Sequence, residues 1–161
     1  METLIHSPFL ERIFRFLISS QPIDRKDGCW VLANFCSSQR GAVAVMRTPL
    51  ITEKLEEMLY YENHLEVRRE MAFIFSYLIG QSDKPAIFQF AARRDFLEVM
   101  AIYLSQGDTD LSIAVLNIIR GLIDLGDEFK DENEANVVAL TITVMPELMN
   151  EIQRAQEHEN S

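Results

Sequence analysis

A helical pattern recurs along this chain at intervals of 43 and 44 residues, and this repeat constrains the fold more than any other feature. Three segments, DGCWVLANFCS, REMAFIFSYLIG and SIAVLNIIRGLIDLG, align by their apolar positions. The alignment places Trp30, Phe73 and Asn117 in equivalent positions. Apolar residues three and four apart share one face of a helix, so each segment is predicted to be an amphipathic helix.

A shorter helix is predicted before each of these segments, and a fourth is predicted near the end of the chain. Each of the four has a recognisable signal in its first turn. Two combine an N-cap residue with a proline in the first turn, a third has the spacing of a capping box, and a fourth begins at a proline. These signals are Ser7 with Pro8, Thr48 with Pro49, Asp95 with Glu98, and Pro146. The short segments GAVAVM, KPAIFQFAAR and EANVVALTITV lie between the units.

Each unit is therefore predicted to be a short helix, a second helix and a longer third helix. A period of about 40–47 residues with two or three helices is typical of armadillo and HEAT arrays. We expect an all-α, right-handed armadillo-repeat solenoid in one domain, 1–161, with approximate repeats 1–38, 39–81, 82–126 and a partial 134–160. Both ends are expected to expose apolar edges. The alternative is a helical bundle whose helices resemble one another by chance.

The charge of the chain indicates which partners it suits. The 161 residues include 15 Lys and Arg and 25 Asp and Glu, for a net charge of −10. No basic footprint of a nucleic-acid binder is visible. An acidic surface suits a basic partner, although solubility alone would also explain it. No apolar stretch approaches the length of a membrane span, and no signal peptide is visible.

Catalytic and metal-binding patterns are not evident in the sequence. The histidines are scattered, and none is spaced for zinc with another His or Cys. Phosphate-binding loops and nucleophile motifs are missing as well. Cys29 and Cys36 lie two helical turns apart, too far for a disulfide, and are predicted to be reduced core residues. We expect no enzyme activity, no cofactor and no metal.

Asp27, Trp30 and Asn34 fall on one stripe of the first long helix, because residues three and four apart are neighbours on a helix. This combination suits a peptide that carries basic side chains. An Asn amide can bond a peptide backbone, an indole face can cover a Lys stem, and a carboxylate can pair with the cation. The alternative is that Trp30 fills the core and Asn34 is a solvated helix residue.

The segments DGCWVLANFCSSQRGAVAVM, REMAFIFSYLIG, VLNIIRGLIDLGDE and LMNEIQRAQEHEN resemble the C-terminal armadillo repeats of the importin-α family. The resemblance covers nearly the whole chain. It implies an adaptor in nuclear protein import, present in cytoplasm and nucleus. Such an adaptor binds Lys/Arg-rich nuclear localisation signals of cargo proteins in a concave groove formed by its third helices. The peptide-binding residues that it implies are Asp27, Trp30, Asn34, Glu70, Phe73, Tyr77 and Asn117.

The chain also departs from the family pattern. Phe73 stands where the family has Trp, and Tyr77 stands where it has Asn. The third repeat offers only Ala114, Asn117 and Gly121 at these positions, and no basic arm for importin-β opens the chain. The alternative function is therefore a diverged armadillo interaction scaffold without signal binding. Self-association through exposed repeat ends is a further expectation.

Overall fold

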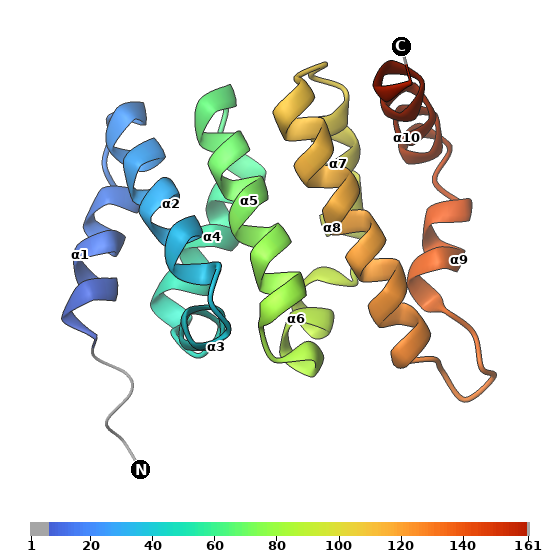
Figure 1. The fold of residues 1–161 in the computed structure, drawn as a ribbon, viewed down its shortest axis with the longest axis horizontal. Helices are drawn as coiled ribbons and strands as arrows, with labels where there is room; N and C mark the ends of the chain where they lie inside the picture. The colour runs from blue at the N-terminus through green and yellow to red at the C-terminus, as the bar shows by residue number, and fades with distance from the viewer. Residues whose placement is uncertain (1–6, 161) are drawn as a thin grey trace. The chain divides into compact units, whose positions relative to one another are not determined.

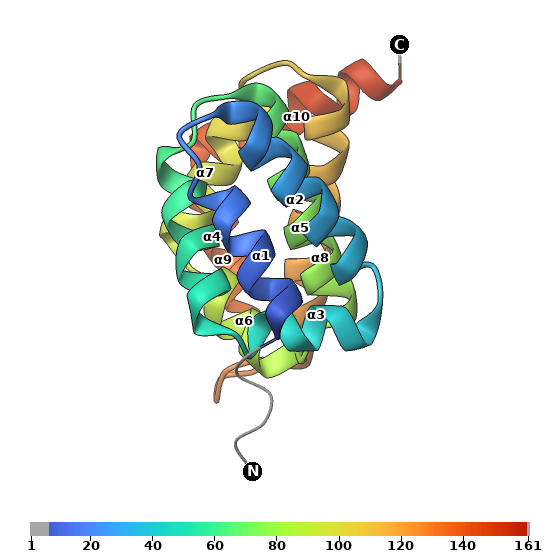
Figure 2. The same ribbon diagram turned by 90° about the vertical axis from the view of Figure 1, so that its left-hand side faces the viewer.

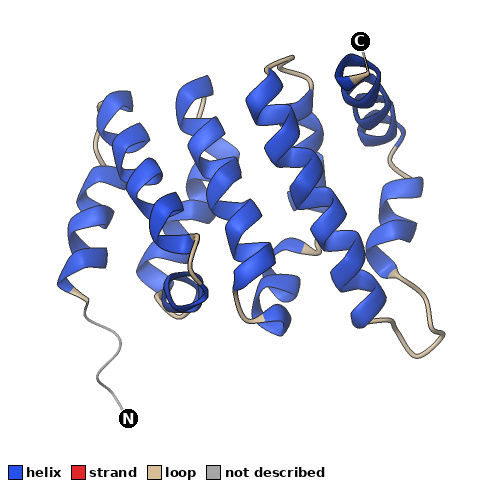
Figure 3. Cartoon of the chain, viewed as in Figure 1, coloured by secondary structure: helices blue, strands red, loops and turns tan. Residues whose placement is uncertain are grey.

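The computed structural model describes residues 7–160 and is helical throughout, with no strand in that range (Figure 3). It divides into two compact units, residues 1–83 and 84–161, of which residues 1–6 and 161 lie outside the described part. The first six residues of the predicted repeat 1–38 are therefore not described. None of the helices within 7–160 combines the length and hydropathy needed to span a bilayer.

The described part of the first unit, residues 7–83, contains five helices (Figure 1): α1 Pro8–Leu17, α2 Pro22–Cys36, α3 Gln39–Met46, α4 Pro49–Tyr61 and α5 Leu65–Gln81. The long helices α2 and α5 pack side by side, and α1 packs against both α2 and α4. Figure 2 shows α4 on one side of this unit and α2 with α5 on the other. Helix α3 contacts α2, α4 and α5, so it packs against both sides of this unit.

Apolar side chains from all five helices form the core of the first unit. The fully buried ones include Leu17, Leu32, Leu55, Met71 and Phe75. Helix α3 approaches the end of α2 so closely that a Cβ on Gly41 would overlap the carbonyl of Phe35. Only glycine permits this contact, since any larger residue would push the two helices apart.

The second unit contains α6 Lys84–Ala91, α7 Arg94–Leu104, α8 Thr109–Glu128, α9 Val137–Thr143 and α10 Pro146–Glu159. Helix α8 packs against α6, α7 and α9, and α10 packs against α7 and α9. Asn136 joins α8 to α9, because its amide donates to the Ile123 carbonyl (2.9 Å) while its Oδ1 accepts from the Ala139 N–H (3.0 Å). Buried Ile87, Phe96 and Leu122 belong to this unit's core.

The predicted order of short, intermediate and long helices occurs in both units. Helices α3, α4 and α5 have 8, 13 and 17 residues, and α6, α7 and α8 have 8, 11 and 20. The predicted helix starts at Pro8, Pro49 and Pro146 are confirmed, with Ser7 and Thr48 at the N-cap positions of the first two.

The predicted capping box at Asp95 and Glu98 is wrong. Helix α7 begins two residues earlier than a capping box at Asp95 requires: its N-cap is Arg93 and its first residue is Arg94, so Asp95 is already helical. Glu98 instead accepts a hydrogen bond from Nε of Arg94, one turn back, at 3.0 Å. A capping residue must keep an extended backbone, and Arg93 has that backbone while Asp95 lies inside the helix, so Asp95 cannot cap it.

Candidate peptide-binding site

The stripe predicted on the first long helix is on the surface of α2. Asp27, Trp30 and Asn34 are all exposed, and 57% of the Trp30 surface is accessible. The opposite face of α2 carries the fully buried Cys29 and Leu32. The alternative in which Trp30 fills the core is therefore wrong. A large aromatic side chain that lies open to solvent between a carboxylate and an amide is available to contact a ligand.

Asn34 is partly engaged by its own helix. Its Nδ2 donates to the backbone carbonyl of Trp30 at 2.9 Å. This bond holds the side-chain amide against the backbone of its own helix. One amide hydrogen and the Oδ1 oxygen remain to bond an incoming peptide. Asn34 can still bracket a peptide group, provided that the peptide approaches from the Oδ1 side.

Helix α5 presents the matching positions 43 residues later. Glu70 and Phe73 are half-buried, and Tyr77 is 38% exposed. The Phe73 ring therefore offers less accessible surface than Trp30 does. Tyr77 supplies a hydroxyl at the end of a rigid ring, which can make one hydrogen bond but cannot bracket a peptide group as an amide can.

The packing of α2 on α5 brings these two stripes together. Helices α2 and α5 pack against each other, and the positive charge of Lys26 on α2 lowers the pKa of the Glu70 carboxyl on α5. Burial raises the pKa of Glu70, and the positive charges of Lys26 and Arg69 offset only part of that rise. A partly desolvated carboxylate gains more from an additional cation than a fully solvated one does.

The spacing of the two helices suits an extended peptide. Packed helices lie about 8–10 Å apart between axes, and an extended chain rises about 3.3 Å per residue. A peptide that crosses α2 and α5 therefore covers the distance in about three residues. Alternate side chains point to the same face of an extended chain, so one of them can face the stripes that carry Trp30 and Phe73.

Asn117 is the one predicted site residue outside the first unit. It lies on α8 of the second unit, where it is exposed, while Ala114 one turn before it is buried. Within the first unit the candidate site is made by α2 and α5, with Asp27, Trp30 and Asn34 on one helix and Glu70, Phe73 and Tyr77 on the other.

A second polar cluster was not predicted from the sequence. Glu62, which follows α4, has a side chain only 3% exposed and forms two hydrogen bonds with Arg25 of α2, at 2.7 and 3.1 Å. Its Oε1 also accepts from the backbone N–H of His64 at 3.0 Å. These interactions outweigh burial and lower the pKa of Glu62 to about 2. The partners are 37 residues apart, and no local pattern links them.

The remaining ionisable groups do not assemble a metal or redox centre among the residues that the structure describes. No three of their His, Cys, Asp and Glu side chains lie close enough together to hold an ion. Both cysteines are free and buried, as predicted, and burial raises the pKa of the Cys36 thiol to about 12. A thiol with so high a pKa is a poor nucleophile at neutral pH.

No protein-family model matches this sequence, and no curated protein matches it either. The geometry of α2 and α5 is therefore the main basis for assigning a function.

Proposed function

We propose that the surface formed by α2 and α5 binds Lys/Arg-rich peptides in extended form. The main support is the exposure of Trp30 within a stripe of carboxylate, aromatic ring and polar group, and the recurrence of that stripe on the packed neighbour α5. The stem of a Lys or Arg side chain lies against the Trp30 indole. Its charged end reaches Asp27 or Glu70.

The expected affinity of this surface is modest. One cation against an indole contributes about 0.5–2 kcal/mol, and Phe73 contributes less than a tryptophan would. Two adjacent contacts in one peptide act in series, because binding of the first raises the effective concentration of the second. The net charge of −10 also favours a basic ligand and accelerates its association at low salt.

The wider proposal follows from the repeat. The chain forms part of an armadillo-type α-solenoid similar to importin-α, and its peptides are nuclear localisation signals of cargo proteins. It acts in cytoplasm and nucleus as a transport adaptor. The two recurring sets of short, intermediate and long helices support this repeat type.

Trp30 makes the test direct, because it is the only tryptophan in the chain. A bipartite Lys/Arg-rich peptide without tryptophan is titrated into the protein while the fluorescence of Trp30 is followed. We expect a saturable change that weakens as salt rises, since the contacts are largely electrostatic. A neutral peptide of scrambled sequence should produce no change.

Affinity is then measured with a labelled peptide against Trp30→Ala and against Ile102→Ala. Ile102 is a matched control, because it is an exposed apolar helical residue of similar accessibility (52%) on α7. Loss of affinity in Trp30→Ala alone supports the proposal. Equal affinity in both variants, or no saturable binding by the unmodified chain, excludes the peptide-binding surface.

A second candidate is an interaction scaffold of armadillo type that has lost signal binding. The observation in its favour is that Tyr77 replaces the amide expected on α5, while other apolar side chains are exposed elsewhere. These are Phe9 and Phe16 on α1 and Leu140 on α9. Association through such side chains would resist salt and would not depend on Trp30.

A further inference from the structure

Each long helix of the peptide surface carries a cation directly before its carboxylate. Lys26 precedes Asp27 on α2, and Arg69 precedes Glu70 on α5, 43 residues later. These four positions together have no formal net charge, although the whole chain has a net charge of −10. A basic ligand responds mainly to the nearby charges, because charges more than about 10 Å away are largely screened at 0.1 M salt.

Lys26 lies beside the aromatic part of the stripe on α2. It is four residues before Trp30, and residues four apart are neighbours on a helix. Lys26 is half-buried, whereas Asp27, the next residue, is exposed. A half-buried lysine covers its aliphatic stem and keeps its ammonium in contact with water. The peptide surface therefore already contains a charge of the kind that the proposed ligand brings.

The charge of Lys26 also acts on α5, which packs side by side with α2. Burial raises the pKa of Glu70, and Lys26 and Arg69 offset part of that rise, Lys26 more than Arg69. Arg69 is the chain neighbour of Glu70, so a residue 44 positions away influences this carboxylate more than its own neighbour does.

A ligand cation that approaches Glu70 therefore shares this carboxylate with Lys26. Repulsion between the two positive charges subtracts from the attraction of each to the carboxylate. The loss is larger at a half-buried group than in open solvent, because the effective dielectric constant is lower there.

We propose that Lys26 is an internal competitor on the peptide surface, and that its ammonium and the cation of the ligand compete for Glu70. This inference rests on the proposed binding of Lys/Arg-rich peptides. Lys26 lowers the affinity for a single cation, so a peptide is held only when it makes several contacts, including the one with Trp30. Replacing Lys26 by a neutral residue strengthens binding.

The test uses a fluorescein-labelled Lys/Arg-rich peptide, whose anisotropy is followed while the full chain is added at low salt. Lys26→Gln removes the charge and keeps a polar side chain, and we expect its affinity to be roughly threefold higher or more. Lys26→Arg keeps the charge and should bind within about twofold of the unmodified chain. In a Glu70→Gln background, Lys26→Gln should gain less than about twofold, because the carboxylate for which the cations compete is gone.

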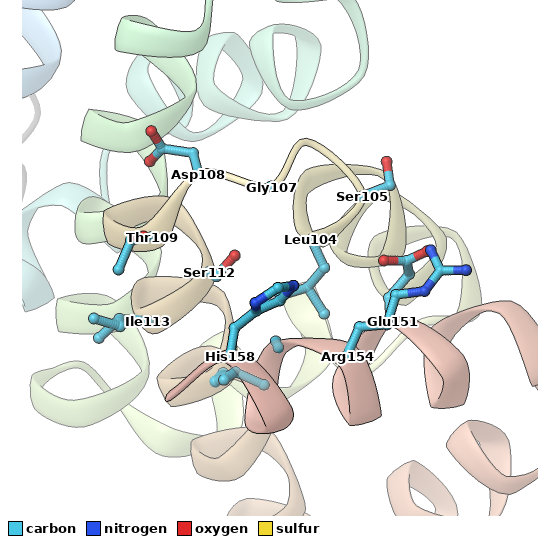
Figure 4. A pocket seen from close by; sticks show the side chains of 12 residues that line it. Leu104, Ser105, Gly107, Asp108, Thr109, Ser112, Ile113, Glu151, Arg154 and His158 are labelled. Atoms are coloured by element: carbon cyan, nitrogen blue, oxygen red, sulfur yellow. The ribbon is translucent and has the colours of Figure 1, made fainter. Parts of the chain in front are cut away.

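Arg154 provides a matched control for the change in net charge. It is a cation on α10 of the second unit, with 69% of its side chain exposed, and it pairs with Glu151 at 2.9 Å. Figure 4 shows both side chains at a cleft of about 350 Å³ between α8 and α10. Arg154→Gln changes the net charge by the same amount as Lys26→Gln, and it should leave the peptide affinity unchanged.

The outcomes separate this inference from the proposed function. Saturable binding of equal strength in the unmodified chain and Lys26→Gln overturns the competition and leaves the peptide surface intact. No binding by either protein overturns both. A gain that also occurs in Arg154→Gln, or that persists in full without the Glu70 carboxylate, overturns the competition as well. Far-UV circular dichroism checks that each variant keeps its helices.

Discussion

Arg25 of α2 and Glu62, the residue after α4, form a two-point ion pair with Nε–Oε2 and Nη2–Oε1 distances of 2.7 and 3.1 Å. Both side chains are largely buried, with 16% and 3% exposed. The pair ties the start of α2 to the junction between α4 and α5. It therefore holds in place the two helices that carry the candidate peptide-binding surface.

The first prediction is that Glu62→Gln lowers the free energy of unfolding by about 3 kcal/mol. Removing one partner of a buried pair leaves the other charge without compensation, which costs about 3–5 kcal/mol in well-buried cases. Urea unfolding measures the change. Glu57→Gln is the control, because Glu57 is 59% exposed and pairs with Lys54, so its loss should cost at most about 1 kcal/mol.

The second prediction concerns pH. The pKa of Glu62 lies near 2, below its ordinary value of 4.5, so the folded state favours the charged form. Its contribution is complete above about pH 5 and is lost as the pH falls toward 2, by about 3 kcal/mol in total. The difference in unfolding free energy between the unmodified chain and Glu62→Gln should therefore shrink between pH 6 and pH 3. A difference that stays constant over this range would contradict the assignment.

The third prediction separates binding from stability at Glu70. Burial raises the pKa of its carboxyl, so the charged form costs stability at neutral pH. Glu70→Gln should leave the chain as stable or make it slightly more stable in urea unfolding. The same variant should bind a Lys/Arg-rich peptide more weakly, because a carboxylate of the surface is lost. A clear loss of stability would show instead that the charged carboxylate of Glu70 is stabilising in the folded chain.

The fourth prediction compares two neighbours on α2. Trp30→Ala should change the unfolding free energy by no more than about 1 kcal/mol, because Trp30 is 57% exposed. Its peptide affinity should fall roughly 2- to 30-fold, the range of one cation–π contact. Leu32→Ala should lower the unfolding free energy by about 2–5 kcal/mol, because Leu32 is fully buried. The peptide affinity of the folded Leu32→Ala protein should be unchanged.

The fifth prediction concerns two helical glycines. Gly41→Ala should destabilise the chain, because the added Cβ would overlap the Phe35 carbonyl and force α3 away from α2. Gly80→Ala should stabilise it by about 0.5–1 kcal/mol, because a Cβ there meets no atom within 4 Å and alanine favours a helix. Thermal unfolding of both variants gives the comparison. A Gly41→Ala protein as stable as Gly80→Ala would show that the two helices can separate without cost.

Local patterns were sufficient for much of the fold. The 3.6-residue periodicity predicted the helical segments, and proline fixed the start of α1, α4 and α10, because its ring fits only the first turn of a helix. The N-cap of α7 was missed by two residues, at Asp95 instead of Arg93. Arg93 is not among the residue types that favour an N-cap, so the local sequence gives no signal for this start.

The candidate site, like the fold, was predicted from the sequence only in part. The sequence by itself determined which residues share a stripe on one helix, as with Asp27, Trp30 and Asn34, because positions three and four apart depend only on helix geometry. The tertiary structure alone decided that Trp30 stays exposed, that burial raises the pKa of Glu70, that Arg25 pairs with Glu62, and that a cleft opens between α8 and α10. These features depend on which helices pack together, and side chains dozens of residues apart leave no local trace of that packing in the sequence.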